Sequence, residues 1–131
     1  NLLTEHLGQG YECRARLIFI GGEFNNPKDG FLGAITIDQI KSYKFDLSFL
    51  GVVGIDLHLG NITTYDIDDG LTKKQVINSS KKSYMLAETA KLKLDGNYVF
   101  SHIDDFTGII CEKAVTLQQR ELINKYGLDI L

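Results

Sequence analysis

Strand-sized apolar segments alternate with helix-compatible segments along this chain, and that alternation constrains its fold more than any other feature. The expected strands are residues 11–20, 47–53, 84–87, 108–111 and 128–131. Helices are expected at about 32–42, from 66 to about 80, and at 116–127. Consecutive parallel strands need a long crossover between them, which is usually a helix packed on the sheet. The sequence therefore predicts an α/β fold with a mostly parallel β-sheet covered by helices.

The first expected strand shows the clearest alternation of side chains. Between residues 11 and 17, apolar residues alternate with the charged Glu12, Arg14 and Arg16, and residues 17–20 are all apolar. Such a pattern is typical of a strand that enters a buried sheet. Gly21-Gly22 ends it. The second expected strand, 47–53, is read as buried and runs into a glycine-punctuated loop over residues 51–60.

Two helices carry recognisable end signals. Asp66 can cap the helix that follows it, because a short acidic side chain accepts hydrogen bonds from the first free backbone N–H groups. Thr116 and Gln119 match the capping-box pattern, and Gly127 is the expected left-handed stop of that helix. At about 100° per residue, the apolar side chains expected to share the buried face of the helix after Asp66 are Ile67, Leu71 and Ile77.

Composition restricts the class of protein. The chain has 131 residues, 44% hydrophobic and 24% charged, without a repeat or a low-complexity tract, which is typical of one globular domain. Its 14 basic and 17 acidic residues give a formal charge of −3, so it lacks the basic surface of an autonomous nucleic-acid binder. No apolar run reaches the roughly 20 residues of a membrane span. The sequence begins at Asn1 rather than Met, which indicates a fragment of a longer protein.

The two cysteines, Cys13 and Cys111, lie far apart and belong to no CxxC motif or metal-ligand cluster. They are interpreted as reduced core residues of a cytoplasmic protein, with a single long-range disulfide as the alternative. His102 has no visible partner, and the adjacent Asp104 and Asp105 fit a helix cap or a solvated loop. Neither a metal nor a cofactor is expected.

Ligands of open α/β sheets bind beyond the carboxyl ends of the strands, where loops and helix N-termini supply backbone N–H groups. Three segments of this chain are expected at that edge. They are Gly21-Gly22 after the first strand, residues 51–60 after the second, and residues 88–91 after the third. We expect a binding site to be assembled from these segments.

Five motifs in the same order resemble those of a known family. They are Gly21-Gly22 with its loop to Gly30, the strand FDLSFLG at 45–51, GID at 54–56 with Gly60 and Thr63-Thr64, Lys73 in the next helix, and MLAETAK at 85–91. Together they are similar to the C-terminal effector domain of DeoR-type bacterial transcriptional repressors. The resemblance covers nearly the whole chain.

This resemblance implies a sugar-isomerase-like fold, related to ribose-5-phosphate isomerases and glucosamine-6-phosphate deaminases. It implies one effector-binding domain over residues 1–131, which binds a phosphorylated sugar and controls operator binding by an N-terminal winged helix-turn-helix upstream of Asn1. It also implies a homo-oligomer, no membrane contact, and a protein that is not an enzyme. Phosphorylated hexoses, hexitols and pentoses all meet the same charge requirement.

A sugar phosphate needs positive charge, close backbone approach and acceptors for its hydroxyl groups. Lysines supply the charge, glycines permit the approach, and carboxylates accept from the hydroxyls. The expected ligand-binding residues are Gly21, Gly22, Gly51, Gly54, Asp56, Lys73, Glu88 and Lys91. Glu88 and Ala90 stand where the family usually has aspartate and serine, which changes the hydrogen bonds available there.

Two other interpretations remain open. The deaminase relatives carry a D-G-H pattern in the loop where this chain has Asp56-Leu57-His58, so an isomerase or deaminase could use Asp56 and His58 as an acid/base pair. A domain with a degenerate pocket, serving only structure or oligomerisation, would bind none of these ligands. For Asp56 itself, the structural alternative is a turn in which its carboxylate accepts from backbone N–H groups.

Overall fold

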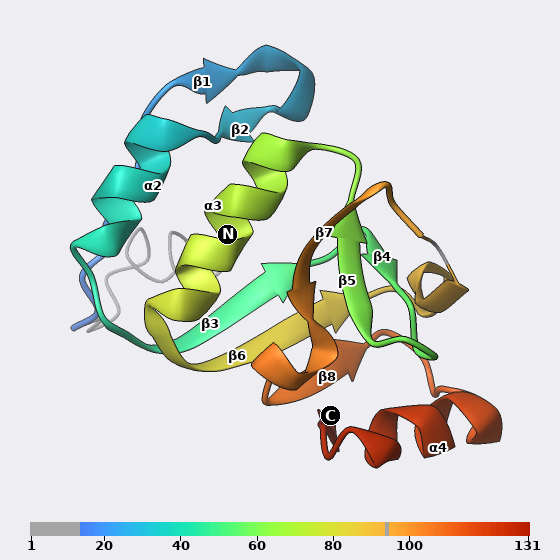
Figure 1. Ribbon diagram of the computed structural model, residues 1–131. Coiled ribbons are helices and arrows are strands. Elements are labelled where there is room, and N and C mark those ends of the chain that lie inside the picture. Colours follow the sequence, from blue (N-terminus) through green and yellow to red (C-terminus); the bar gives the residue numbers. More distant parts are fainter. Residues whose placement is uncertain (1–13, 94) are drawn as a thin grey trace.

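The computed structural model describes residues 14–93 and 95–131, which form an α/β fold (Figure 1). Its central sheet has four parallel strands in the order β3, β6, β8 and β9, which span Phe45–Gly51, Ser80–Ala87, Gly108–Cys111 and Asp129–Ile130. A smaller antiparallel sheet has the order β4, β5 and β7, which span Gly54–Ile55, Asn61–Thr64 and Tyr98–His102. The predicted fold class is confirmed.

The helices and short elements connect these sheets. The α-helices α2, α3 and α4 span Ala34–Lys41, Ile67–Asn78 and Leu117–Lys125. The 3-10 helices η1, η2 and η3 span Asn26–Lys28, Thr89–Lys93 and Ile103–Asp105. Strands β1 (Phe24–Asn25) and β2 (Gly30–Phe31) form a hairpin above α2 in Figure 1. Among the described helices, none is long and apolar enough to cross a membrane.

The predicted end signals of two helices are confirmed. The Asp66 side chain accepts from the backbone N–H groups of Asp68 and Asp69 at the start of α3. At the start of α4, Thr116 and Gln119 exchange hydrogen bonds in a capping box. These signals act between residues two or three positions apart, which is why the sequence alone reveals them.

The central sheet buries one face and exposes the other among the described residues. On the buried face, Met85 and Ile109 are fully inaccessible to solvent. On the opposite face, Leu47 and Phe49 of β3 are about half exposed. The prediction of a buried strand at 47–53 is therefore wrong in part: the run ends at Gly51, and only alternate side chains lie in the core.

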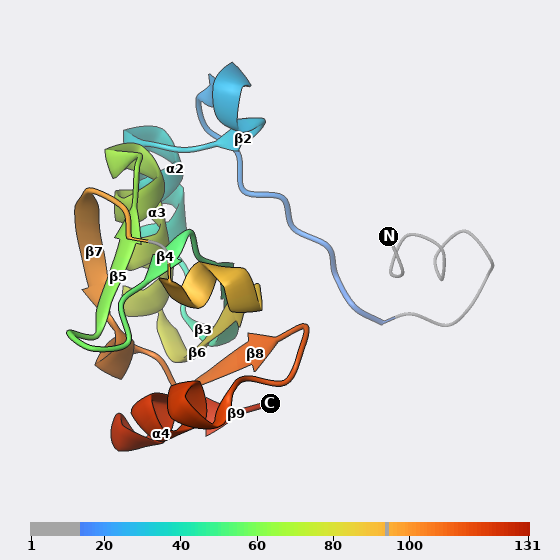
Figure 2. The same ribbon diagram turned by 90° about the vertical axis from the view of Figure 1, so that its right-hand side faces the viewer.

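The prediction of a strand over residues 11–20 is not supported where the structure describes it. Residues 14–20 have no strand pairing, and Leu17, Ile18 and Phe19 are exposed (Figure 2). Residues 11–13, with Cys13, lie outside the described residues. A strand forms only when a neighbour accepts and donates its backbone hydrogen bonds, and the described part of the chain places no strand beside this segment.

The buried face of α3 differs in part from the predicted one, because only Ile77 of its three predicted apolar residues packs against the core. Ile67 and Leu71 are exposed, whereas Gly70 and Thr72 are buried. A Cβ atom at Gly70 would lie 3.0 Å from atoms of Phe100 and Thr64, so the helix approaches the smaller sheet closely. Small residues permit this approach, whereas larger apolar side chains on that face would hold the helix away.

Candidate functional site

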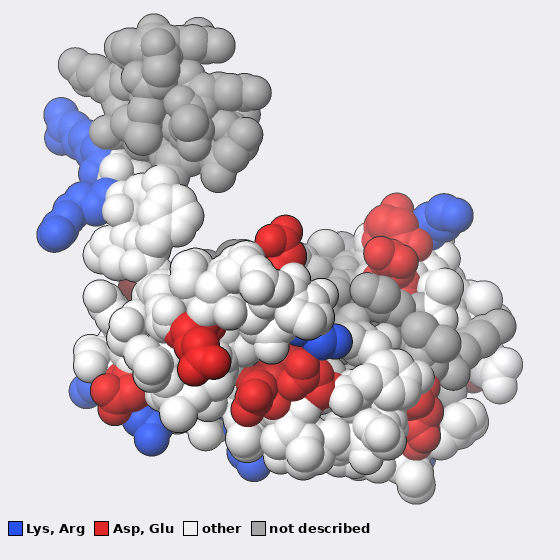
Figure 3. Space-filling model, turned by 90° about the horizontal axis from the view of Figure 1, so that it is seen from above, with Lys and Arg blue, Asp and Glu red and all other residues white. Residues whose placement is uncertain are grey.

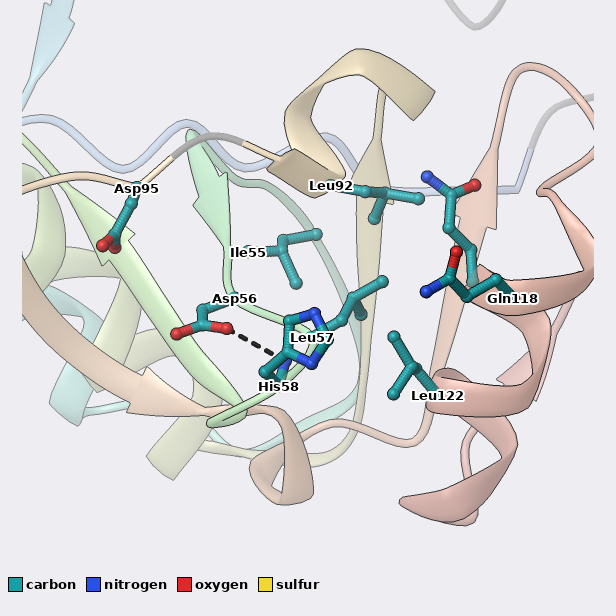
Figure 4. Close-up of a pocket in the computed structure, with 9 residues that line it drawn as sticks. Ile55, Asp56, Leu57, His58, Leu92, Asp95, Gln118 and Leu122 are labelled. Atoms are coloured by element: carbon teal, nitrogen blue, oxygen red, sulfur yellow. Dashed lines mark hydrogen bonds between the residues drawn. The ribbon is translucent and has the colours of Figure 1, made fainter.

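A pocket of about 410 Å³ lies between the loop that follows β4 and the first turns of α4 (Figure 4). It is lined by Ile55, Asp56, Leu57, His58, Leu92, Asp95, Gln118, Gln119 and Leu122. The aliphatic side chains give it an apolar floor, and the carboxylate, imidazole and amide groups supply polar atoms. Pockets of this size and composition are typical of small-molecule binding.

Asp56 is held by its own loop. One carboxylate oxygen, Oδ1, accepts from the backbone N–H groups of His58 at 2.9 Å and Leu59 at 3.2 Å. The Asp56 carbonyl accepts from the Gly60 N–H at 2.7 Å. Asp56 thus forms the turn named as the structural alternative, in which its carboxylate accepts from backbone N–H groups. Its second carboxylate oxygen has no hydrogen bond within the described residues and is available to a ligand.

The side chains of Tyr126 and His102 contact this loop from other parts of the fold. The Tyr126 hydroxyl, at the end of α4, donates to the His58 carbonyl oxygen at 3.0 Å. The His102 Nε2 lies 3.1 Å from the Leu59 carbonyl oxygen, while its Nδ1 accepts from the Asp104 N–H at 3.2 Å. The Asp104 carboxylate also lies 3.2 Å from Nδ1, so both ring nitrogens of His102 have polar neighbours. The expectation that His102 lacks a partner is therefore wrong.

The charges in the pocket are acidic. Asp56 and Asp95 line it together with His58, and no lysine or arginine side chain that the structure describes does so. Carboxylate and amide oxygens accept hydrogen bonds from hydroxyl groups, whereas a phosphate dianion needs cations or free N–H groups. The described pocket is therefore suited to the hydroxylated part of a ligand.

A second hollow, of about 440 Å³, lies at the carboxyl ends of the parallel strands. Gly51, Glu88, Cys111 and Glu112 are among its lining residues. Burial, followed by the charge of Glu112, raises the pKa of the Cys111 thiol, so this thiol is expected to react slowly. Two of the predicted site residues, Gly51 and Glu88, meet at this edge.

Glu112 gives this edge a pH-dependent contact. The Thr89 N–H donates to both carboxylate oxygens at 3.0 Å, and these bonds hold the pKa of Glu112 below its usual 4.5. A lowered folded-state pKa stabilises the fold above the unfolded pKa and loses that effect as pH falls through the folded value. We expect the difference in unfolding free energy between wild type and Glu112→Gln to shrink from pH 6 to pH 3.

Urea unfolding of both proteins between pH 3 and pH 7 measures this difference. At low pH the protonated Glu112 side chain resembles glutamine, so the two stabilities should approach each other. A difference that stays constant over this range would show that the Glu112 charge contributes nothing.

The other predicted site residues lie elsewhere. Gly21 bonds to α2, because its carbonyl accepts from the Thr36 hydroxyl at 2.9 Å and its N–H donates to Gln39 at 3.0 Å. The neighbouring Gly22 has φ +141° and packs against Thr36. Both glycines thus contact α2, and neither lines the Asp56 pocket or the hollow at the strand ends.

Gly54, Lys73 and Lys91 are the remaining predicted site residues. Gly54 is buried in β4, opposite Thr63 of β5. Lys73 lies on α3 and forms an ion pair with Asp69 at 3.1 Å. The side chain of Lys91 lies outside the described part of the structure, although its backbone belongs to η2. The eight residues are therefore not gathered into one described cavity; of them, Asp56 alone lines the pocket beside α4.

The sequence did not predict that side chains of α4 line this pocket. The capping box indicates where this helix starts, but no local pattern indicates that Gln118, Gln119 and Leu122 face a loop about 60 residues earlier in the chain. Within residues 14–93 and 95–131, no group of three or more His, Cys, Asp or Glu side chains could hold a metal ion.

The surface charge is unlike that of a nucleic-acid interface. Figure 3 shows acidic side chains spread over the face seen from above, with few and scattered basic side chains, of which two lie together at the upper left. Autonomous DNA or RNA binders instead concentrate Lys and Arg on one face. The described face in that view therefore offers no basic patch to a phosphate backbone.

The chain is similar to a known protein family and to several transcriptional regulators. Residues 5–113 match the family described as the DeoR C terminal sensor domain. The HTH-type transcriptional repressor GlcR of Bacillus subtilis is 25% identical over 115 residues, which cover 88% of this chain and 44% of that protein. The uncharacterized HTH-type transcriptional regulator FruR of Bacillus subtilis is 32% identical over 79% of this chain and 38% of its own length.

A third relative is the glycerol-3-phosphate regulon repressor of Escherichia coli. It is 30% identical over 76 residues, which cover 58% of this chain and 30% of the repressor. The chain thus spans less than half the length of each of these curated relatives.

Proposed function

Since the chain belongs to the DeoR C-terminal sensor domain family, we propose that it binds a phosphorylated sugar at the Asp56 pocket and thereby regulates DNA binding by the whole protein. The names of its relatives support this: one is a glycerol-3-phosphate regulon repressor and another a lactose phosphotransferase system repressor. Such a regulator acts on operator DNA in the bacterial cytoplasm, through a winged helix-turn-helix outside this sequence, and is expected to be a homo-oligomer.

The observation that carries the proposal is the geometry of Asp56. Its Oδ1 holds the loop, and its other oxygen is left for the pocket. A carboxylate with one fixed and one available oxygen is preorganised, so it accepts from a sugar hydroxyl without first reorganising the backbone. Asp95 supplies a second acidic side chain in the same pocket.

The phosphate requires a positive charge beside this pocket. Lys91 is the residue proposed for it, because it precedes Leu92, whose side chain lines the pocket. Gly51, Gly54, Lys73 and Glu88, with Gly21 and Gly22, stay predictions of the family resemblance. Of these, Gly51 and Glu88 line the same hollow at the carboxyl ends of the parallel strands.

We propose binding without turnover. The described hydrogen bonds of the Asp56 carboxylate go to backbone N–H groups, which orients the loop rather than the His58 ring. A proton-transfer pair needs the imidazole within hydrogen-bond reach of the acid or of the reacting atom. Incubating the protein with sugar phosphates and following the mixture by NMR should show no product; turnover abolished by His58→Ala would establish the enzyme instead.

Thermal unfolding with a panel of sugar phosphates tests the binding itself. A ligand at about 100 times its dissociation constant adds roughly 2.7 kcal/mol to the folded state. For domains near this size, about 2 to 8 °C accompany each kcal/mol. The panel should hold hexose, hexitol and pentose phosphates, and a selective rise in melting temperature is expected. If no compound raises it, the sensor proposal is wrong.

Asp56 variants separate ligand binding from loop support. Asp56→Asn keeps an oxygen that accepts from the His58 and Leu59 N–H groups but removes the charge. Asp56→Ala removes both. We expect both variants to weaken the ligand-induced shift by roughly 1.5 to 3 kcal/mol, the range for a hydrogen bond to a charged group.

The unliganded proteins provide the control for this pair. Only Asp56→Ala should lower the melting temperature clearly, by an amount that corresponds to about 1 kcal/mol for a lost backbone cap. An unchanged ligand response in Asp56→Ala would place the binding site away from this pocket.

A further inference from the structure

Helix α4 lies outside the segment that matches the sensor-domain family, yet it forms one wall of the Asp56 pocket. The match covers residues 5–113, and α4 spans Leu117–Lys125. The opposite wall, with Asp56 and His58, lies within the matched segment. The pocket thus combines a loop from the matched segment with a helix from outside it.

We infer that α4 distinguishes among the ligands of this pocket, with Gln118 as a specificity-determining residue that contacts a hydroxyl group of the bound sugar. This inference rests on the proposed function, because it assumes that the pocket binds a sugar phosphate. Beyond that function, it identifies α4 as the element that distinguishes one arrangement of sugar hydroxyl groups from another.

The side chains of α4 that line the pocket have different roles. Leu122 lies one turn after Gln118 and contributes an apolar surface (Figure 4). Gln119 is buried, and its Oε1 accepts from the Thr116 N–H at 3.0 Å as part of the capping box. The side chain of Gln118 is exposed and forms no hydrogen bond with any described residue. It is therefore the α4 side chain whose amide is fully available to a ligand.

The chemistry of the opposite wall explains why an amide is useful here. Asp56 and Asp95 accept hydrogen bonds but cannot donate any when ionised. A sugar hydroxyl that donates to a carboxylate still has lone pairs that accept. The Gln118 amide supplies N–H donors as well as an oxygen acceptor, so it complements the carboxylates across the pocket. A hydroxyl in the wrong orientation loses one of these bonds, which produces discrimination.

The position of α4 relative to the loop is fixed by direct contacts. The Tyr126 hydroxyl bonds to the His58 carbonyl oxygen across 68 residues of sequence. Ile123, on the same helix, is fully buried in the core. These two anchors fix the backbone that carries Gln118 relative to the loop, and a site built on a fixed helix is more precise than one built on a loop.

Calorimetric titration of the whole chain tests the inference with named probes. These are the 6-phosphates of glucose, mannose, galactose, 2-deoxyglucose and sorbitol, together with ribose 5-phosphate. In Gln118→Ala, we expect the dissociation constant of the preferred hexose phosphate to rise about threefold to tenfold, which is the effect of one lost neutral hydrogen bond. For the probe that lacks or inverts the contacted hydroxyl, the constant should stay unchanged.

Glu121→Ala is the matched control, because Glu121 is exposed on the same helix and does not line the pocket. It should leave every dissociation constant unchanged, and neither variant should alter the melting temperature of the unliganded protein. If Gln118→Ala preserves all ratios between probes, α4 does not read the hydroxyl pattern, even though the binding proposal stands. If the wild-type chain binds no probe, both proposals are wrong.

Discussion

A Met85→Ala variant is expected to lose about 2 to 5 kcal/mol of folding free energy, the usual range when a large buried aliphatic side chain is removed. Met85 is completely buried in β6, between Leu50 of β3 and Ile109 of β8 in the sheet register. Removing its side chain leaves a cavity that rigid parallel strands on both sides cannot readily fill. Urea unfolding followed by circular dichroism measures the loss.

Leu86→Ala is the matched control, because it lies on the same strand, one residue further on, with its side chain on the other face. Leu86 is 43% exposed. Its truncation should cost about 1 kcal/mol or less, because much of the side chain stays in contact with water in the folded protein. Equal losses in the two variants would mean that the face carrying Leu86 is as buried as the core, which contradicts the described packing.

Gly60→Ala is expected to disrupt the Asp56 loop as well as the stability of the fold. Gly60 has φ +79°, and a left-handed conformation costs a residue with a Cβ atom about 1 to 2 kcal/mol. A Cβ at this position would also overlap with the His102 ring. The ring must then move, which breaks the contact of its Nε2 with the Leu59 carbonyl. We expect a lower melting temperature and a weaker response to sugar phosphates.

The double variant Gly60→Ala/His102→Ala separates the two causes. Removing the imidazole relieves the overlap but leaves the backbone strain and the lost hydrogen bond of about 0.5 to 1.5 kcal/mol. The double variant should therefore be more stable than the sum of the single changes predicts. Strict additivity in thermal unfolding would show that Gly60 and His102 do not touch.

The elements that sequence analysis predicted well are those specified by nearby residues. The caps of α3 and α4 depend on Asp66 and on the Thr116–Gln119 pair, each within three positions of its partner. Strand β8 was predicted with its observed bounds, because a short apolar run between turn residues leaves few alternatives. Local patterns of this kind need no knowledge of the rest of the chain.

The elements that were missed depend on distant partners. Strands β5 and β7 pair with each other although more than 30 residues separate them, and together with β4 they form the smaller sheet. Residues 14–20 have a strand-like pattern but no paired neighbour where they are described. Two strands pair when the fold places their segments side by side. The alternation of apolar and polar residues within one segment does not predict which segment will be its neighbour.

Local sequence patterns were sufficient to predict the α/β class, the N-terminal caps of α3 and α4, and the relation of the chain to the DeoR sensor domain family. Which side chains line the Asp56 pocket depends instead on how distant segments pack together. Gln118 and Leu122 reach that pocket because α4 is anchored by Ile123 in the core and by Tyr126 on the His58 carbonyl. Such contacts join residues far apart in the chain, so their geometry depends on the packing of the whole domain.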